Sequence, residues 1–270
     1  MPFLDINRGR LYYEEAGSGP AVVFVHAGIA DHRMWDDQWE AFAAHYHVVR
    51  YDTRGYGQTT TEDVPYSNRA DLLALLDHLN IGRATLIGCS RGGQIAADFA
   101  LEHPDRAAAL VLSCAGLGGL AYEPDEEMVL SDEAEAAEEA GDWARVIDLD
   151  VRIWVDGFGR PAGAVSDARL MPIREKIRMM EWDSVAHNAE GGQPEVLEPA
   201  AVGRLGELQL PALVVCGDYD TGHSKRSAEG YSAGIAGAQR INLPTAHLPN
   251  MELPGEFNRL VLDFLKSALV

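Results

Sequence analysis

A serine near the middle of the chain stands between a strand signal and a helix signal, at Gly88-Cys89-Ser90-Arg91-Gly92. Residues 84–87 before it are a short apolar run of strand type, and residues 94–101 after it are Ala-rich and helix-forming. A G-x-S-x-G turn in this setting exposes the serine hydroxyl and brings two backbones so close that small residues must flank it. A serine before a helix is more often an N-cap, so other features of the sequence are needed to assign a catalytic role to Ser90.

Strands are predicted on either side of this turn, at 21–25, 47–51, 108–113, 211–216 and 239–243. Those at 21–25, 108–113 and 211–216 are continuous apolar runs, which are typical of strands covered on both faces. A hairpin of residues 3–7 and 11–15 precedes them, and amphipathic helices are predicted at 35–45, 66–80 and 255–268. This alternation predicts an α/β fold with a mostly parallel, twisted sheet and helices on both faces. Ligands bind beyond the carboxyl ends of such strands, where Ser90 and Gly28 both fall.

The alternation of strand and helix stops between residues 118 and 207. We expect this segment to be a helical cap inserted into a core domain of residues 1–117 and 208–270, with helices at 148–155 and 174–182. Its stretch 123–142 carries ten acids and no base, which is typical of a solvated helix face on a peripheral element. Because the segment is rich in aromatic and methionine residues, we predict a substrate pocket that includes Trp154, Met179, Trp182 and, from the core, Leu248.

The charge and the cysteines narrow the function classes. A formal net charge of −20 argues against nucleic acid and against anionic lipid as partners. No run of 18 apolar residues is present and the N-terminus lacks a secretory pattern, so we expect a cytoplasmic protein without a membrane partner. Cys89, Cys114 and Cys216 are too far apart for a metal motif or a disulfide scaffold, and we expect them to be buried free thiols. No cofactor or metal site is predicted.

A serine hydroxyl needs a base to act as a nucleophile, and a histidine base needs an acid to fix its tautomer. On this type of sheet the order along the chain is Ser, then Asp or Glu, then His. His247 follows the last predicted strand and Asp220 follows the strand before it, so both fall at the same sheet edge as Ser90. His223 is a weaker candidate for the base, because it lies only three residues from Asp220 on one loop.

Five ordered segments together resemble the α/β-hydrolase superfamily, and the resemblance runs from about residue 3 to 268. They are 88–92, His26-Ala27-Gly28, 52–57, 217–220 and 246–249. The resemblance implies catalytic Ser90, Asp220 and His247. It also implies an oxyanion hole made by the backbone N–H groups of Gly28 and Arg91, and a structural role for His26. Alanine replaces the family's usual glycine at Ala27 and Ala246.

The function implied is a serine hydrolase that cleaves a small-molecule carboxylic ester or lactone, and the chain is similar to enol-lactonases and small esterases. A haloperoxidase or perhydrolase without a cofactor, a C–C bond hydrolase or a hydroxynitrile lyase could use the same three residues. A non-catalytic ligand-binding scaffold is the third possibility. The negative charge disfavours an anionic substrate unless arginines line the pocket. The oligomeric state is left open, with a homodimer as one option.

Overall fold

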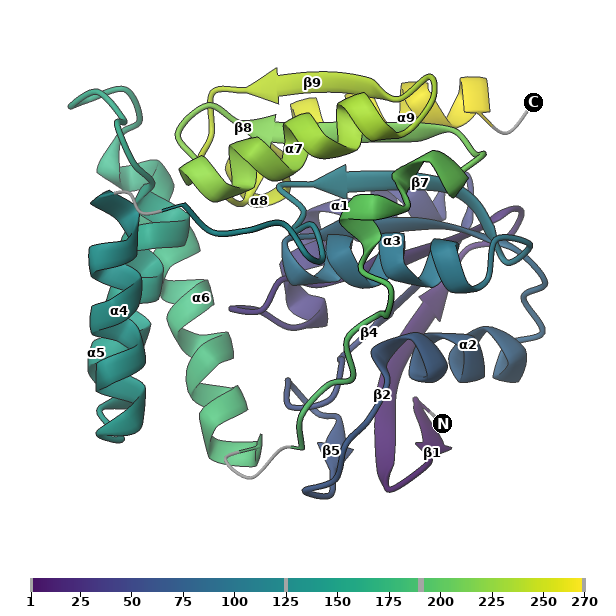
Figure 1. Cartoon of the computed structure of the whole chain (residues 1–270), viewed down its shortest axis with the longest axis horizontal. Helices are drawn as coiled ribbons and strands as arrows, with labels where there is room; N and C mark the ends of the chain where they lie inside the picture. Colours follow the sequence, from purple (N-terminus) through teal and green to yellow (C-terminus); the bar gives the residue numbers. More distant parts are fainter. Residues whose placement is uncertain (1, 124–125, 189–191, 269–270) are drawn as a thin grey trace.

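The computed structural model describes residues 2–123, 126–188 and 192–268. Its centre is one twisted sheet in the strand order β1-β2-β4-β3-β6-β7-β8-β9, and β5 pairs with β2 beside this path (Figure 1). The strands are β1 (Phe3–Ile6), β2 (Gly9–Ala16), β3 (Ala21–Val25), β4 (His47–Tyr51), β5 (Thr60–Thr61), β6 (Ala84–Cys89), β7 (Ala107–Ser113), β8 (Ala212–Gly217) and β9 (Gln239–Leu243). All pairs from β4 to β9 are parallel, whereas β2 is antiparallel to its neighbours. The predicted α/β fold is confirmed.

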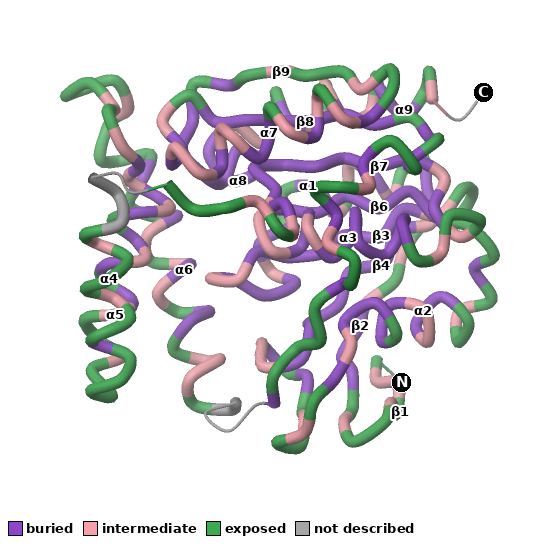
Figure 2. Tube along the Cα trace, in the orientation of Figure 1, coloured by how far each residue is buried: buried purple, intermediate pink, exposed green. Residues whose placement is uncertain are grey.

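Alternate residues of each central strand pack on opposite faces of the sheet, which is why these strands are apolar along their whole length. In β3, Val23 and Val25 join the cluster on one face, while Val22 and Phe24 join the cluster on the other. Figure 2 shows the central strands buried, whereas β9 is largely exposed. Both faces of the sheet therefore need a layer of helices.

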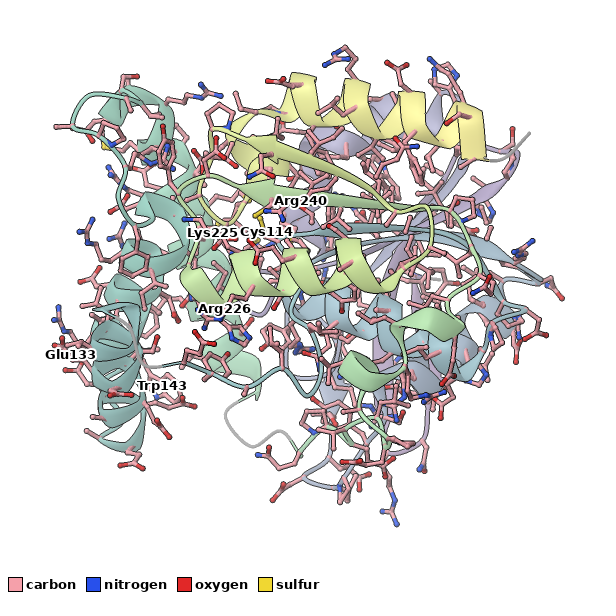
Figure 3. The ribbon with its side chains drawn as sticks, turned by 45° about the horizontal axis from the view of Figure 1, so that its top comes forward. Cys114, Glu133, Trp143, Lys225, Arg226 and Arg240 are labelled. Atoms are coloured by element: carbon pink, nitrogen blue, oxygen red, sulfur yellow. The ribbon has the colours of Figure 1, made fainter. Side chains whose placement is uncertain are left out.

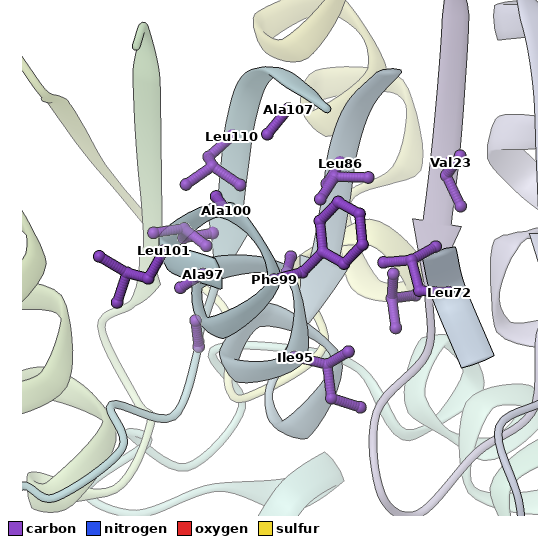
Figure 4. Packing of buried hydrophobic residues seen from close by; sticks show 14 of the residues in the cluster. Val23, Leu72, Leu86, Ile95, Ala97, Phe99, Ala100, Leu101, Ala107 and Leu110 are labelled. Atoms are coloured by element: carbon purple, nitrogen blue, oxygen red, sulfur yellow. The ribbon is translucent and has the colours of Figure 1, made fainter. Parts of the chain in front are cut away.

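One face is covered by α2 (Asn68–His78), α3 (Arg91–Glu102) and α7 (Gly222–Gly234), and the opposite face by α1 (Asp36–Ala43) and α9 (Pro254–Ala268). Figure 4 shows the first of these layers, in which Phe99 and Ile95 of α3 pack with Leu72 of α2 against Leu86 and Val23 of the sheet. A short helix, α8 (Pro249–Glu252), precedes α9, and a 3₁₀ turn at His32–Trp35 precedes α1. Two further 3₁₀ turns, Ala201–Gly203 and Leu205–Glu207, lead into β8.

A helical segment separates β7 from β8, and we call residues 126–188 the insertion. It contains α4 (Glu126–Glu139), α5 (Trp143–Asp150), a π-helical turn (Val151–Asp156) and α6 (Asp167–Asn188). In Figure 1 these helices stand beyond the sheet edge to which the arrowheads of β7 and β9 point. The insertion therefore faces the edge where ligands of parallel sheets bind.

Most predicted elements are present with shifts of one to three residues at their ends, as is usual at frayed termini. The helix predicted at 174–182 is longer, since α6 runs over Asp167–Asn188, and α5 begins earlier than predicted, at Trp143. The sequence analysis did not predict α7 or β5. Residues 124 and 125 of the predicted acidic stretch lie outside the described residues.

The three cysteines are buried free thiols, as expected. Among the described residues, no helix is both long enough and apolar enough to cross a membrane.

Candidate active site

Ser90 lies at the junction of β6 and α3 with φ 54° and ψ −121°, a backbone conformation that costs a non-glycine residue about 1–3 kcal/mol. Close packing imposes this turn. A Cβ at Gly92 would lie 2.2 Å from the Val25 carbonyl oxygen, and one at Gly88 would lie 2.3 Å from the Gly92 carbonyl oxygen. The Ser90 N–H donates to the Ser113 carbonyl at 3.0 Å, so β7 also holds the turn. The serine is positioned by the backbone, and its side chain makes no N-cap bond to α3.

His247 and Asp220 form a buried pair on the loops after β9 and β8. His247 Nδ1 lies 2.8 Å and 2.9 Å from the two carboxylate oxygens of Asp220, and the side chains are 3% and 0% exposed. The backbone N–H of Thr221 donates to Asp220 Oδ1 at 2.7 Å. His247 Nε2 is buried and has no hydrogen-bond partner among the described residues. With Nδ1 held by the carboxylate, the imidazole is left with Nε2 to accept a proton.

The insertion binds directly to both of these loops. The His247 N–H donates to the Trp154 carbonyl at 3.2 Å, and the Phe158 N–H donates to the Tyr219 carbonyl at 2.9 Å. Gly157 lies between them with φ 75°, and a Cβ there would come within 2.7 Å of Ala246 Cβ. The insertion thus connects the acid loop and the base loop through its backbone.

A buried ion pair adds a second link between the insertion and the loop of His247. Arg160 Nη2 donates to Glu252 Oε1 and Oε2 at 3.1 and 2.9 Å, and the two side chains are 9% and 2% exposed. Glu252 Oε1 also accepts from the N–H of Ala246, the residue before His247, at 2.6 Å. The Arg160 guanidinium lies 4.9 Å from the centre of the Tyr219 ring. The Glu252 carboxylate therefore holds both the backbone before His247 and the insertion.

Gly28 and Arg91, the predicted oxyanion donors, lie next to each other. A Cβ at Gly28 would be 3.9 Å from Arg91 Cβ. The neighbouring Ala27 N–H donates to Met34 Sδ at 3.2 Å, so this N–H group is already engaged. His26 is fully buried; its Nδ1 lies 2.7 Å from the Ala27 carbonyl and its Nε2 accepts from the Thr53 N–H at 3.0 Å. Burial lowers the pKa of His26 to about 4, so it stays neutral and holds the loop.

A cavity of about 750 Å³ lies between the sheet edge and the insertion, and Ser90 and His247 both line it. Trp154 lines it as predicted, and its ring centre is 4.4 Å from that of His247. Met179, Trp182 and Leu248, which were also predicted to line a pocket, are not among the residues that line this cavity. Met179 and Trp182 are each 46% exposed, since α6 turns this face to solvent, and Leu248 is fully buried in the core on one face of the sheet.

Sequence reasoning missed several residues of this cavity. The loop after β7 contributes Cys114 and 116–120, and Tyr122 and His223 stack on each other with ring centres 3.8 Å apart. Glu135 and Glu138 of α4 are exposed, as expected of the acidic stretch, and they also line the cavity. Their three-residue spacing, which places two side chains on one side of a helix, was the available signal.

Two carboxyl groups of the insertion are close to each other beside this cavity. Burial and the proximity of Asp150 raise the pKa of Glu181 to about 10. Burial also raises the pKa of Asp150 to about 6, although Trp154 Nε1 donates to Asp150 Oδ1 at 3.0 Å and favours its charged form. At pH 8 the pair therefore carries one negative charge, on Asp150, and Glu181 keeps its proton.

This pair predicts a pH dependence of stability that Glu181→Gln should reduce. Because the folded-state pKa of Glu181, about 10, exceeds its ordinary value of 4.5, the unfolded chain binds fewer protons than the folded one between these values. Its contribution to the free energy of unfolding therefore falls as pH rises, by at most about 1.4 kcal/mol per pH unit. Urea unfolding at pH 6 and pH 8 should show a smaller loss of stability in Glu181→Gln than in wild type.

The matched control is Glu175→Gln, which removes an exposed carboxyl group from the same helix and should keep the wild-type pH dependence. An unchanged pH dependence in Glu181→Gln would contradict the assignment of a buried, protonated Glu181.

Two groups of side chains among the described residues could be considered as metal ligands, Cys114 with Asp220 and His247, and Asp31 with His32 and Asp52. In both groups the strongest donors are already engaged, since Asp220 holds His247, and His32 Nδ1 lies 2.7 Å from Asp52 Oδ1. Burial and the nearby Asp220 raise the pKa of the Cys114 thiol well above its ordinary value, which disfavours the thiolate that a metal needs. We assign a metal to neither group.

Comparison with known proteins gives consistent results over almost the whole chain. The family model for the alpha/beta hydrolase fold matches residues 20–252. A 3-oxoadipate enol-lactonase of Acinetobacter baylyi is 27% identical over 92% of this chain and 89% of its own length. A 2-hydroxy-6-oxo-6-phenylhexa-2,4-dienoate hydrolase of Comamonas testosteroni is 26% identical over 97% and 93%. The crystal structure of an enol-lactonase from Burkholderia xenovorans superposes with a TM-score of 0.77 at 26% identity, covering 98% of this chain and 100% of the other.

Proposed function

The chain belongs to the alpha/beta hydrolase fold family and, from this premise, we propose that it is a serine hydrolase of small carboxylic esters or lactones. One observation carries the proposal: the buried Asp220–His247 pair leaves His247 Nε2 without a partner among the described residues, in the cavity that Ser90 also lines. The relatives named as enol-lactonases support a lactone or ester as substrate.

In the proposed mechanism, Ser90 Oγ attacks the carbonyl carbon while His247 Nε2 takes its proton. Asp220 holds the imidazole in the required orientation and stabilises its positive charge. The backbone N–H groups of Gly28 and Arg91 stabilise the oxyanion, and one such donor contributes about 3 kcal/mol to transition-state stabilisation. His247 then protonates the leaving alkoxide, and water, deprotonated by the same nitrogen, releases the acid from Ser90.

In this proposal the insertion acts as a cap that closes the site. Its residues form one wall of the cavity, and its backbone bonds to the acid and base loops keep the cavity and the reacting groups in one unit. Excluding water strengthens the hydrogen bonds on which the oxyanion depends.

The test combines covalent labelling with a substrate panel. A fluorophosphonate probe should label wild-type protein on Ser90, as mapped by peptide mass spectrometry, and the enzyme should hydrolyse 4-nitrophenyl acetate, 4-nitrophenyl butyrate or a simple lactone. Labelling of Ser90 without cleavage of any ester or lactone would favour the second candidate, C–C bond hydrolysis, which the dienoate hydrolase among the relatives supports. No labelling by any serine-directed probe would overturn both and favour a binding scaffold.

A further inference from the structure

The cavity is asymmetric in charge. Its wall formed by the insertion carries three carboxyl groups, those of Glu135 and Glu138 on α4 and of Asp150 on α5. Among the described residues that line the cavity, Arg91 is the only lysine or arginine. A ligand in this cavity therefore meets negative charge on the wall formed by the insertion, and not at the turn between β6 and α3 that carries Ser90, which we call the elbow.

These three carboxyl groups are not neutralised within the protein. None of the ion pairs formed between described residues includes them. Two arginines of the neighbouring helices pair elsewhere. Arg145 of α5 lies 2.5 Å from Glu133, and Arg178 of α6 lies 2.9 Å from Asp148. Neither Glu133 nor Asp148 lines the cavity. The wall keeps its negative charge, since neither Arg145 nor Arg178 pairs with it.

The single guanidinium of the lining is also engaged. Arg91 Nη2 donates to Thr53 Oγ1 at 2.6 Å, and the guanidinium carbon lies 4.5 Å from the centre of the Tyr56 ring. Both partners belong to the loop after β4, so the positive charge is directed at the core and away from the insertion. Arg226 of α7 does not line the cavity, and it lies 3.7 Å from Glu123.

The acidic wall lies beside His247 and Trp154, two side chains of the same cavity that could contact a ligand. His247 Nε2, in a side chain only 3% exposed, has no partner among the described residues and belongs to the same lining. Between it and Asp150 stands Trp154, whose Nε1 donates to Asp150 and whose ring packs on His247. An aromatic face beside a carboxylate is a favourable environment for a cation.

We infer that the cavity selects esters or lactones whose non-reacting part carries a positive charge and disfavours those that carry a carboxylate, with Glu135, Glu138 and Asp150 as the specificity-determining residues. This inference rests on the proposed hydrolase function. The ammonium group would lie against α4 and α5 while the carbonyl carbon lies at Ser90. In a partly screened cavity, we expect a charge effect of about tenfold in kcat/KM in each direction.

The test uses 4-nitrophenyl esters that differ in charge at one end. The 4-(trimethylammonio)butanoate and the 5,5-dimethylhexanoate esters have the same shape, since a quaternary nitrogen replaces a carbon, and the hydrogen glutarate ester supplies a carboxylate. Wild-type kcat/KM should rank cationic above neutral above anionic, and high ionic strength should compress the ranking. The double variant Glu138→Gln/Asp150→Asn should bring the cationic-to-neutral ratio close to one.

Glu139→Gln is the control, because Glu139 is an exposed carboxyl group at the end of α4 that lies outside the cavity lining. Glu133 is not used, because its removal would release Arg145. Figure 3 labels Glu133 on α4 and Cys114 away from it, near β8 and α7. Glu139→Gln should retain the wild-type ratios. Hydrolysis of the neutral ester with a cationic-to-neutral ratio near one, or a preference for the glutarate ester, would overturn the inference and leave the proposed hydrolase intact. Failure to hydrolyse all three esters, together with the absence of Ser90 labelling, would overturn the proposed function itself.

Discussion

Ser90→Ala is expected to lower kcat for ester hydrolysis by roughly a thousandfold or more, because the residues of such a unit depend on one another. The loss should appear in kcat at saturating substrate, since the cavity walls that bind substrate are unchanged. The variant should also lose all fluorophosphonate labelling. Circular dichroism and urea unfolding should match wild type within about 1 kcal/mol, because only one oxygen atom is removed and the backbone of the elbow is held by Gly88 and Gly92.

The second variant in this experiment is Asp220→Asn, which removes the charge that orients His247. Alone it should cost several orders of magnitude in kcat, and combined with Ser90→Ala it should cost almost nothing further, because the acid acts only through the serine. Ser232→Ala on α7, whose hydroxyl donates to the Ala228 carbonyl, serves as the control and should keep wild-type activity. Additive losses in the double variant would mean that Ser90 and Asp220 act independently, which would contradict the proposed mechanism.

The fold was predictable from the sequence because its central strands β3, β6, β7 and β8 are buried on both faces and therefore read as continuous apolar runs. The elbow was predictable for a similar reason, since Gly88 and Gly92 occupy positions where a Cβ would collide with backbone. Asp220 and His247 were located by chain order, because parallel strands deliver their following loops to one sheet edge. In each case the residues of a short segment are determined either by local packing or by the position of the segment in the sheet, and both can be inferred from the sequence.

The wall of the cavity was not predictable in this way. Met179 and Trp182 are apolar residues on α6, and composition could not reveal that their side of the helix faces solvent. Glu135 and Glu138 of α4 are exposed, as the sequence indicates, and the docking of the insertion on the sheet edge also places them on the cavity. Which face of an amphipathic helix meets a ligand depends on packing between distant segments. The spacing of Glu135 and Glu138 indicates that they share a face of α4, but it does not indicate what that face meets.

Arg160→Met is expected to destabilise the protein and to impair catalysis although Arg160 does not line the cavity. Without the guanidinium, the Glu252 carboxylate is left almost fully buried and unpaired, and burial already raises its pKa. Breaking a buried pair in this way costs roughly 3–5 kcal/mol of unfolding free energy. Because Glu252 also holds the N–H of Ala246, we expect His247 to shift, and a displacement of about 1 Å can lower kcat by roughly a hundredfold.

The control for this prediction is Arg174→Met. Arg174 pairs with Asp156 at 2.7 Å in the same insertion, but the pair is partly exposed and involves neither the loop of Asp220 nor that of His247. Arg174→Met should therefore lower the free energy of unfolding by less than about 1 kcal/mol and leave kcat unchanged. Urea unfolding and steady-state kinetics of the two variants separate a general weakening of the insertion from a specific effect on the base.

Adding Glu252→Gln to Arg160→Met tests the origin of the two effects. Glutamine removes the unpaired charge but keeps an oxygen that can accept from Ala246, so the double variant should recover part of the lost stability and part of kcat. If Arg160→Met instead keeps wild-type kcat, the insertion does not position His247 through this pair. The insertion would then position His247 through the backbone bond to Trp154 and the packing of the Trp154 ring on the imidazole.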